Sequence, residues 1–121
     1  MQYRQMVKKV QVDSGFSDAE SEEALRLFVE TLAARLNEGE RRDFAAQLPR
    51  ELQPLAMAPT TERYSANDMY EQFTQLQEID LAHAKKQIKA AWAAVKESIG
   101  PGEVADIRSQ LPKDLKAELP D

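Results

Sequence analysis

The sequence predicts an all-α fold, namely a single bundle-like helical domain made of two pseudo-symmetric units with three helices each. Residues 36–52 return as residues 99–115 at a constant spacing of 63 residues, without a gap. Apolar residues recur at the 3.6-residue spacing of a helix, and no alternating strand pattern occurs. Because a fixed-period repeat defines the structural unit, the organisation follows. We expect one domain over residues 1–121, with repeat 1 at 3–55, a linker at 56–65 and repeat 2 at 66–118.

The first helix of each unit is predicted from an apolar stripe at positions i, i+3, i+4 and i+7. In repeat 1 the stripe consists of Tyr3, Met6, Val7 and Val10. In repeat 2 its equivalent consists of Met69, Tyr70, Phe73 and Leu76. We expect both stripes to be buried.

The second helix of each unit has a start signal and a longer stripe. Ser17 and Glu20 form a capping box, in which the serine accepts from an amide and the glutamate reaches back, and Asp80 is the matching N-cap. The stripes are Leu25, Phe28, Val29, Leu32 and Leu36, and then Leu81, Ala84, Ile88, Trp92, Val95 and Ile99. Neither unit encloses enough apolar surface alone, so we expect the two stripes to pack together, with Trp92 as a core anchor.

The third helix of each unit begins within the repeated segment. Asn37 is the predicted N-cap of a second capping box completed by Glu40. In the other copy Gly100 takes the cap and Pro101 the first helical position, where a missing N–H costs nothing. Pro49 and Pro112 end these helices and are expected to open short final ones. The tail after Leu115 is predicted to fray.

The totals limit the class of protein. The 121 residues include 42% hydrophobic, 31% charged and no cysteine, which fits one globular domain and excludes disulfides, thiolate metal sites and a cysteine nucleophile. No apolar stretch approaches the ~18 residues of a spanning helix, and the start lacks the apolar region of a signal peptide. We therefore expect a soluble, cytoplasmic protein with no membrane contact.

The net charge of −5 is spread evenly along the chain. Residues 1–58 contain 8 Lys and Arg against 10 Asp and Glu, and residues 59–121 contain 8 against 11. Nucleic-acid affinity comes mostly from neutralising phosphates, so this balance disfavours nucleic acid as a partner.

One motif carries a resemblance to a known family. The run Leu36-Asn37-Glu38-Gly39-Glu40 is followed by Asp43 and by Gln47-Leu48-Pro49. A Gly-Glu…Asp…Gln-Leu-Pro pattern after a long amphipathic helix resembles the uncharacterised prokaryotic family catalogued as domain of unknown function 2267, over essentially the full length. Asn37-Glu38 here, and Gly100 in the second copy, depart from the Ser-Pro of the common pattern but keep a workable cap. The resemblance supports the helical fold and a bacterial-type protein, and it transfers no catalytic residue.

The repeated carboxylates are the strongest candidates for a functional site. Glu40 with Asp43, and Glu103 with Asp106, stand at i, i+3 and so share a helix face. Paired carboxylates can bind a divalent cation or carry acid–base chemistry. Acidic residues in a first turn also satisfy free amides and the helix dipole, and this structural interpretation is the one we favour. We assign no catalytic, cofactor or metal residue.

The other polar candidates are also interpreted structurally. Gln47 and Gln110 precede the helix-ending prolines and are expected to bond the backbone freed there, rather than a partner. His83 is the only histidine and has no evident nucleophile or metal partner, so we expect a solvated surface residue. Two basic patches are expected to be solvated faces offset by acidic neighbours. They consist of Lys85, Lys86 and Lys89, and of Arg4, Lys8 and Lys9.

Three functions remain open. The leading hypothesis is a non-enzymatic helical module for protein interaction or scaffolding, because the chain duplicates helix faces and lacks catalytic motifs. Its partner would be another protein or a second copy of itself. The first alternative is a divalent-cation-dependent or enzymatic domain that uses the repeat-motif carboxylates. The second is weak nucleic-acid binding through Lys85, Lys86 and Lys89.

Overall fold

The computed structural model describes residues 1–58 and 66–121. These ranges contain eight α-helices and no strand, so the all-α prediction is confirmed. The helices are α1 (Tyr3–Ser14), α2 (Asp18–Ala33), α3 (Glu38–Ala46), α4 (Gln53–Ala56), α5 (Ala66–Gln77), α6 (Leu81–Ser98), α7 (Pro101–Ser109) and α8 (Lys113–Glu118). None of them is both long and apolar enough to cross a bilayer. Most of the expected linker, residues 59–65, lies outside the described residues.

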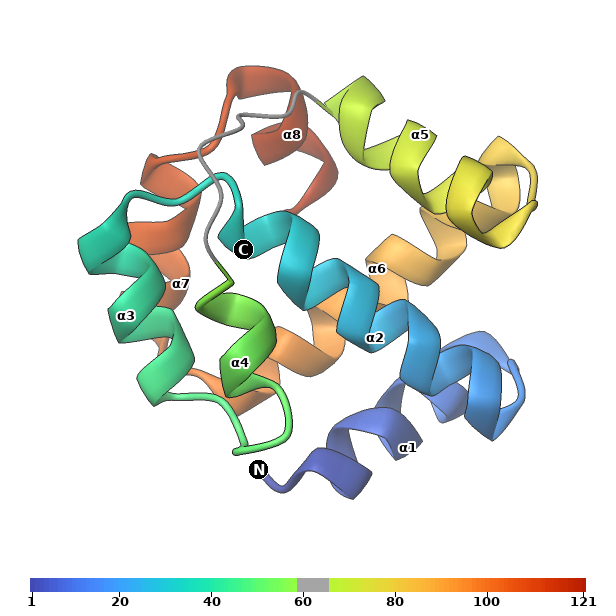
Figure 1. The fold of residues 1–121 in the computed structure, drawn as a ribbon, viewed down its shortest axis with the longest axis horizontal. Helices are drawn as coiled ribbons and strands as arrows, with labels where there is room; N and C mark the ends of the chain where they lie inside the picture. Colours follow the sequence, from blue (N-terminus) through green and yellow to red (C-terminus); the bar gives the residue numbers. More distant parts are fainter. Residues whose placement is uncertain (59–65) are drawn as a thin grey trace.

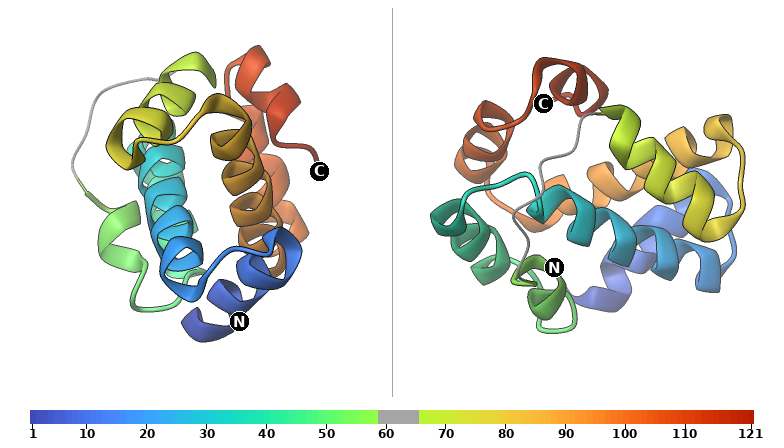
Figure 2. Two further views of the ribbon diagram at one scale, coloured as in Figure 1. Left: turned by 90° about the vertical axis from the view of Figure 1, so that its right-hand side faces the viewer. Right: turned by 45° about the horizontal axis from the view of Figure 1, so that its top comes forward.

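The two longest helices, α2 and α6, run through the middle of the molecule and contact each other (Figure 1). Helix α1 packs on both of them, and α5 packs on α6. Helices α3 and α7 contact each other at the opposite end, where they lie side by side (Figures 1 and 2). Helix α4 covers α2 and α3, and α8 packs on α5. The molecule therefore has a central helix pair that carries a pair of short helices at one end.

The core lies where the predicted stripes of α2 and α6 meet. The rings of Phe28 and Trp92 lie 6.2 Å apart at an angle of 56°, and Trp92 is 2% exposed, so its predicted role as a core anchor is confirmed. The prediction was wrong for Leu76 and Leu81, which are 67% and 48% exposed. Both flank the turn between α5 and α6 at the outer edge of the molecule (Figure 1), where fewer elements remain to cover them.

The C-terminal tail is docked, so the prediction that it frays was wrong. Leu119 is fully buried. The Trp92 indole Nε1 donates to the carbonyl of Pro120 at 2.6 Å, and Arg108 Nε donates to the carbonyl of Leu119 at 2.8 Å. The apolar Leu119 and these two donors hold the chain end against α6 and α7.

The final helices form as expected at α8 but start late at α4. Pro112 is the N-cap of α8. Pro49 opens only a turn, in which Leu52 N–H donates to the Pro49 carbonyl at 2.9 Å, and α4 begins at Gln53. The predicted inward residues Leu52 and Leu115 are both fully buried.

Two chain reversals give a stability prediction. Gly15 ends α1 with φ of 77°, and Glu78, 63 residues later, has φ of 55°. Left-handed backbone is open to glycine but costs other residues about 1 kcal/mol or more. We therefore expect Glu78→Gly to raise the free energy of unfolding by about 0.5–1 kcal/mol, measured by urea denaturation.

The matched control is Gly15→Ala. A Cβ at Gly15 would meet no atom within 4 Å, so this substitution reports on backbone strain alone and should lower stability by about 1 kcal/mol. A Glu78→Gly protein less stable than the wild type would contradict the assigned backbone conformation.

Candidate functional site

The site is built where α3 and α7 begin. Asn37 caps α3 as predicted, because its Oδ1 accepts from the Glu40 N–H at 2.8 Å. Helix α7 starts at Pro101 after Gly100, also as predicted. Both starts bring a glutamate into the first turn, namely Glu40 on α3 and Glu103 on α7.

The two helix starts are bonded to each other by glutamines. The Gln110 Oε1 accepts from the Asn37 N–H at 3.0 Å, and the Gln47 Oε1 accepts from the Gly100 N–H at 2.9 Å. The expectation that each glutamine bonds the backbone at its own proline was therefore wrong. So was the second capping box, since Gln110 takes the bond expected from Glu40.

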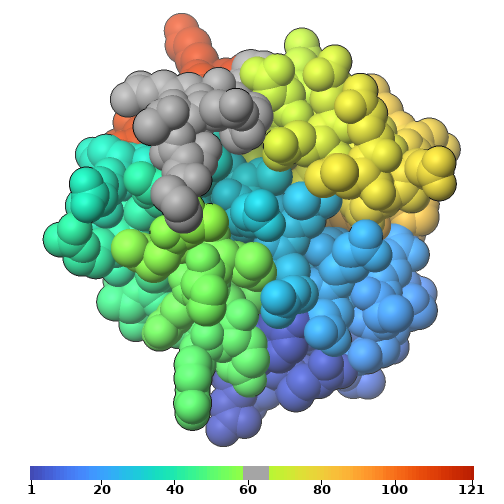
Figure 3. All heavy atoms as spheres, in the orientation of Figure 1, coloured from blue at the N-terminus to red at the C-terminus, as the bar shows by residue number. Residues whose placement is uncertain are grey.

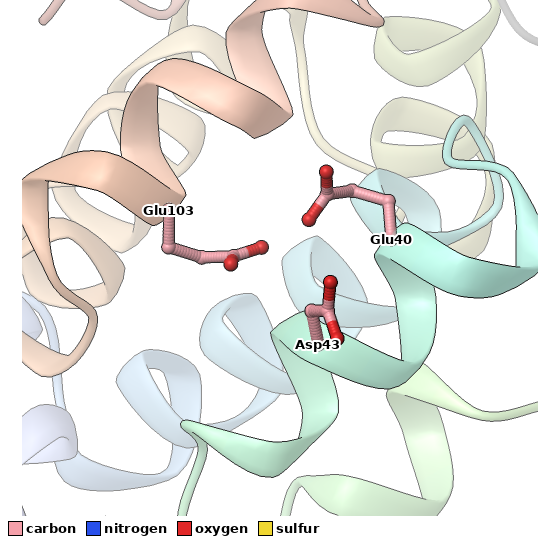
Figure 4. A group of neighbouring side chains, drawn as sticks. All are labelled: Glu40, Asp43 and Glu103. Atoms are coloured by element: carbon pink, nitrogen blue, oxygen red, sulfur yellow. The ribbon is translucent and has the colours of Figure 1, made fainter.

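Because Gln110 serves the Asn37 amide, Glu40 is available to face α7. Glu40, Asp43 and Glu103 each offer a carboxylate oxygen, and these three oxygens all lie within 4.8 Å of one another. Figure 4 shows Glu103 extending from α7 toward Glu40 and Asp43 on α3. We call this group the carboxylate trio. It joins carboxylates from both repeats and leaves out Asp106, the equivalent of Asp43.

The trio combines one buried carboxyl with two more accessible ones. Glu103 is 8% exposed, Glu40 is half-buried and Asp43 is exposed. Glu103 Oε2 accepts from Gln47 Nε2 at 3.2 Å. Its Oε1, like Oε2 of Glu40, is buried and has no hydrogen-bond partner among the described residues. A buried acceptor without a donor costs about 1–3 kcal/mol, so this corner has an unmet electrostatic need.

The surroundings of Glu103 make its ionisation difficult. Burial raises the pKa of Glu103 most, and the carboxyls of Glu40, Asp43 and Asp106 raise it further, to about 8. Near neutral pH the trio therefore holds a proton in the absence of another positive charge. Carboxyls this close either share a proton or bind a cation, because they cannot all stay ionised in a poorly solvated place.

The first predicted capping box forms only in part, and its glutamate contacts His83. The Ser17 Oγ accepts from the Glu20 N–H at 3.1 Å, but Glu20 Oε2 contacts His83 Nε2 and accepts from Gln87. Burial by itself would raise the pKa of Glu20, yet the hydrogen bonds from His83 and Gln87 lower it. His83 also stacks on Phe16 at 4.9 Å, so the expectation of a solvated histidine was wrong.

The two basic patches are partly occupied by neighbours. Arg4 pairs with Asp18 at 2.5 Å and with Glu22 at 3.0 Å. In the other patch, Lys85 lies over the Tyr70 ring and Lys86 over the Phe16 ring, at 5.2 and 5.3 Å from the ring centroids. These contacts agree with balanced surface charge.

The fold and the trio together define a class, a small all-α domain with an acidic site between two short helices. The chain belongs to the family described as Uncharacterized conserved protein (DUF2267), which matches residues 3–118. The resemblance expected from the Gly-Glu…Asp…Gln-Leu-Pro pattern is thereby confirmed. A search of curated proteins found no match.

Sequence reasoning missed how the trio is assembled. It paired Glu40 with Asp43 and Glu103 with Asp106 along each helix, whereas the structure joins the first pair to Glu103 alone. The repeat itself held a usable signal, since Glu40 and Glu103 occupy the same position in the two copies. Equivalent residues can meet where two copies of a unit pack together.

Proposed function

We propose that this protein is a non-enzymatic helical binding module that holds a divalent cation between α3 and α7. The observation that carries the proposal is the buried Oε1 of Glu103, which has no donor and faces the carboxyls of Glu40 and Asp43. Placement in a first helical turn accounts for an exposed acidic residue. It does not account for a carboxyl that is 8% exposed beside two others.

The ligand set favours a hard cation. All three ligands are carboxylate oxygens, which suit Mg²⁺, Ca²⁺ and Mn²⁺. Calcium binds oxygen at about 2.3–2.6 Å, so oxygens on opposite sides of it lie roughly 5 Å apart. The spread of at most 4.8 Å between the ligand atoms is compatible with one such ion. Bound there, the ion would take the place of the proton and neutralise the carboxylates.

The test is calorimetric titration with Mg²⁺, Ca²⁺ and Mn²⁺ at pH 7.5, with the melting temperature measured in parallel. We expect binding heat for at least one ion and a rise in melting temperature, since a ligand that binds only the folded state stabilises it. Glu103→Gln and Asp43→Asn should weaken binding at least tenfold. Asp106→Asn is the matched control and should bind like the wild type, because Asp106 lies outside the trio.

Absence of heat and of thermal stabilisation with all three ions would overturn the cation proposal. The trio would then be a proton-sharing pair with a neighbour. Equal weakening by Asp43→Asn and Asp106→Asn would also count against it, because only a general loss of negative charge would explain that result.

Protein interaction is the second candidate function, and one observation favours it. A hollow with a volume of about 620 Å³ runs along α2 and is lined by leucines and glutamates from three helices. Such a surface can take a helix from a partner or from a second copy of the chain. The observations give nucleic-acid binding no comparable support, because the basic side chains described above lie beside acids and aromatic rings.

We also propose that the site arose by duplication of one unit in a prokaryotic, cytoplasmic protein. The exchanged bonds support the duplication, because Gln47 and Gln110 occupy equivalent positions and bond the equivalent residues Gly100 and Asn37. The absence of cysteine fits a reducing compartment. Asp43 and Asp106 are then where the copies differ in use.

A further inference from the structure

We propose that the surface along α2 between α4 and α5 docks a basic amphipathic helix of a partner protein. This inference rests on the interaction role above and is independent of the cation site. Figure 3 shows α2, in blue to teal, on the surface between α4 in green and α5 in yellow. We call this surface the α2 groove. Its lining consists of Ala19, Glu22, Glu23, Arg26, Leu27, Glu30, Leu55 and Leu76.

The shape of the α2 groove fits a helix. Six of its lining residues lie on α2 between Ala19 and Glu30, spaced three or four apart along one face. They are a different face from the buried stripe of Leu25, Phe28 and Leu32. At 1.5 Å per residue this face is about 17 Å long. The groove therefore offers about three turns of contact to a helix lying along α2.

The centre of the groove is apolar. Leu27 on α2 and Leu55 on α4 are partly buried and pack against the core. Leu76 on α5 is 67% exposed. Leu76 was expected in the core, and in the structure it forms one wall of the hollow. Three leucines from three helices provide the contact that the apolar face of an amphipathic helix requires.

The rim of the groove is acidic. Glu22, Glu23 and Glu30 line it against the single cation Arg26. Arg4 pairs with Glu22 at 3.0 Å, so Glu23 and Glu30 carry most of the remaining negative charge. Complementary charge selects the partner and opposes the wrong ones. Lysine and arginine beside the apolar face of the partner helix would meet this rim.

The same charges decide between possible occupants. An anionic lipid surface attracts basic protein faces, so it would be repelled by the groove. A second copy of this chain carries a net charge of −5 and is disfavoured at long range. A basic amphipathic helix is the occupant that satisfies both the leucines and the glutamates.

The probe is a dye-labelled model helix of 16 residues, made of leucine on one face and lysine on the other. Two companions have the same length, one with glutamate in place of lysine and one with the leucine–lysine order scrambled. Binding to the full chain is measured by fluorescence anisotropy at about 0.15 M salt. We expect the basic amphipathic helix to bind at least tenfold more tightly than either companion.

Matched variants locate the binding. Leu76→Ser should weaken it about tenfold, whereas Val12→Ser, at a residue equally exposed at 67% on α1, should not change it. The double variant Glu23→Lys, Glu30→Lys should weaken binding more than tenfold. Glu97→Lys, at an exposed position on α6, is the corresponding charge control. Circular dichroism confirms that each variant is folded.

The outcomes separate this inference from the interaction role. If the basic helix binds but Leu76→Ser and Val12→Ser weaken it equally, the α2 groove is the wrong surface and the interaction role stands. Tighter binding of the acidic or scrambled helix overturns the charge argument alone. Failure of all three helices to bind, with a monomer by sedimentation, overturns both. A dimer that Leu76→Ser dissolves would assign the groove to a second copy and overturn the inference.

Discussion

Trp92→Ala is expected to lower the free energy of unfolding by about 3–5 kcal/mol, the largest stability effect in the molecule. Trp92 is 2% exposed and packs against Phe28 between the two central helices. Removing its ring leaves a cavity that neighbouring side chains fill only in part. The substitution also removes the N–H that bonds the Pro120 carbonyl at 2.6 Å. Urea denaturation followed by circular dichroism measures the effect.

Trp92→Phe separates the two contributions. It keeps an aromatic ring in the core but loses the indole N–H, so the loss from the bond to Pro120 should be about 1 kcal/mol, with a further cost for the smaller ring. A Trp92→Ala protein with stability close to that of the wild type would show that the α2 and α6 stripes do not form the core.

The second large effect is a fall in stability as the pH rises from about 4.5 to 8. In the unfolded chain Glu103 ionises near its ordinary pKa of 4.5, whereas in the folded protein burial and the neighbouring carboxyls raise this pKa to about 8. Between these values the folded state binds more protons than the unfolded state. The unfolding free energy therefore decreases, by up to about 1.4 kcal/mol per pH unit.

Glu103→Gln isolates this effect because glutamine does not ionise. The variant should match the wild type near pH 4.5 and exceed it in stability at pH 8, when divalent cations are absent. Asp106→Asn is the control and should largely keep the wild-type slope. Parallel pH profiles for the wild type and Glu103→Gln would contradict the buried position of this carboxyl. Denaturation midpoints at each half unit of pH provide the measurement.

The cation proposal adds a condition to the same experiment. A bound ion neutralises the trio, so a saturating cation should restore stability at pH 8 and have little effect near pH 4.5. Restoration should be absent in Glu103→Gln. The pH profile thus reports the proton and the ion at one place, and the two bind in competition.

Local features of the fold were predictable because their causes are local. Ser17, Asn37 and Asp80 cap helices because each is a short polar residue directly before an apolar periodic run. Trp92 was placed in the core because its spacing from Ile88 and Val95 is that of one helix face. These interactions span a few residues, and the residue types at fixed offsets specify them.

The errors share a different cause. Leu76 stands at a correct helical spacing but is 67% exposed, because periodicity identifies a face and not what covers it. The tail after Leu115 was expected to fray, yet its end bonds Trp92 and Arg108. His83 was expected in solvent and instead contacts Glu20, 63 residues away. In each case a distant element supplied the contact.

The candidate site divides along the same line. The sequence by itself determined that the protein is helical, where its helices begin, and that Glu40 and Asp43 share one helix face, because these properties depend on neighbours along the chain. Only the tertiary structure decided that Glu103 joins them, that Gln47 and Gln110 exchange bonds, and that Asp106 stays outside. The packing of α3 against α7 sets the distances between residues more than 50 positions apart, and in this way it turns repeated carboxylates into one site.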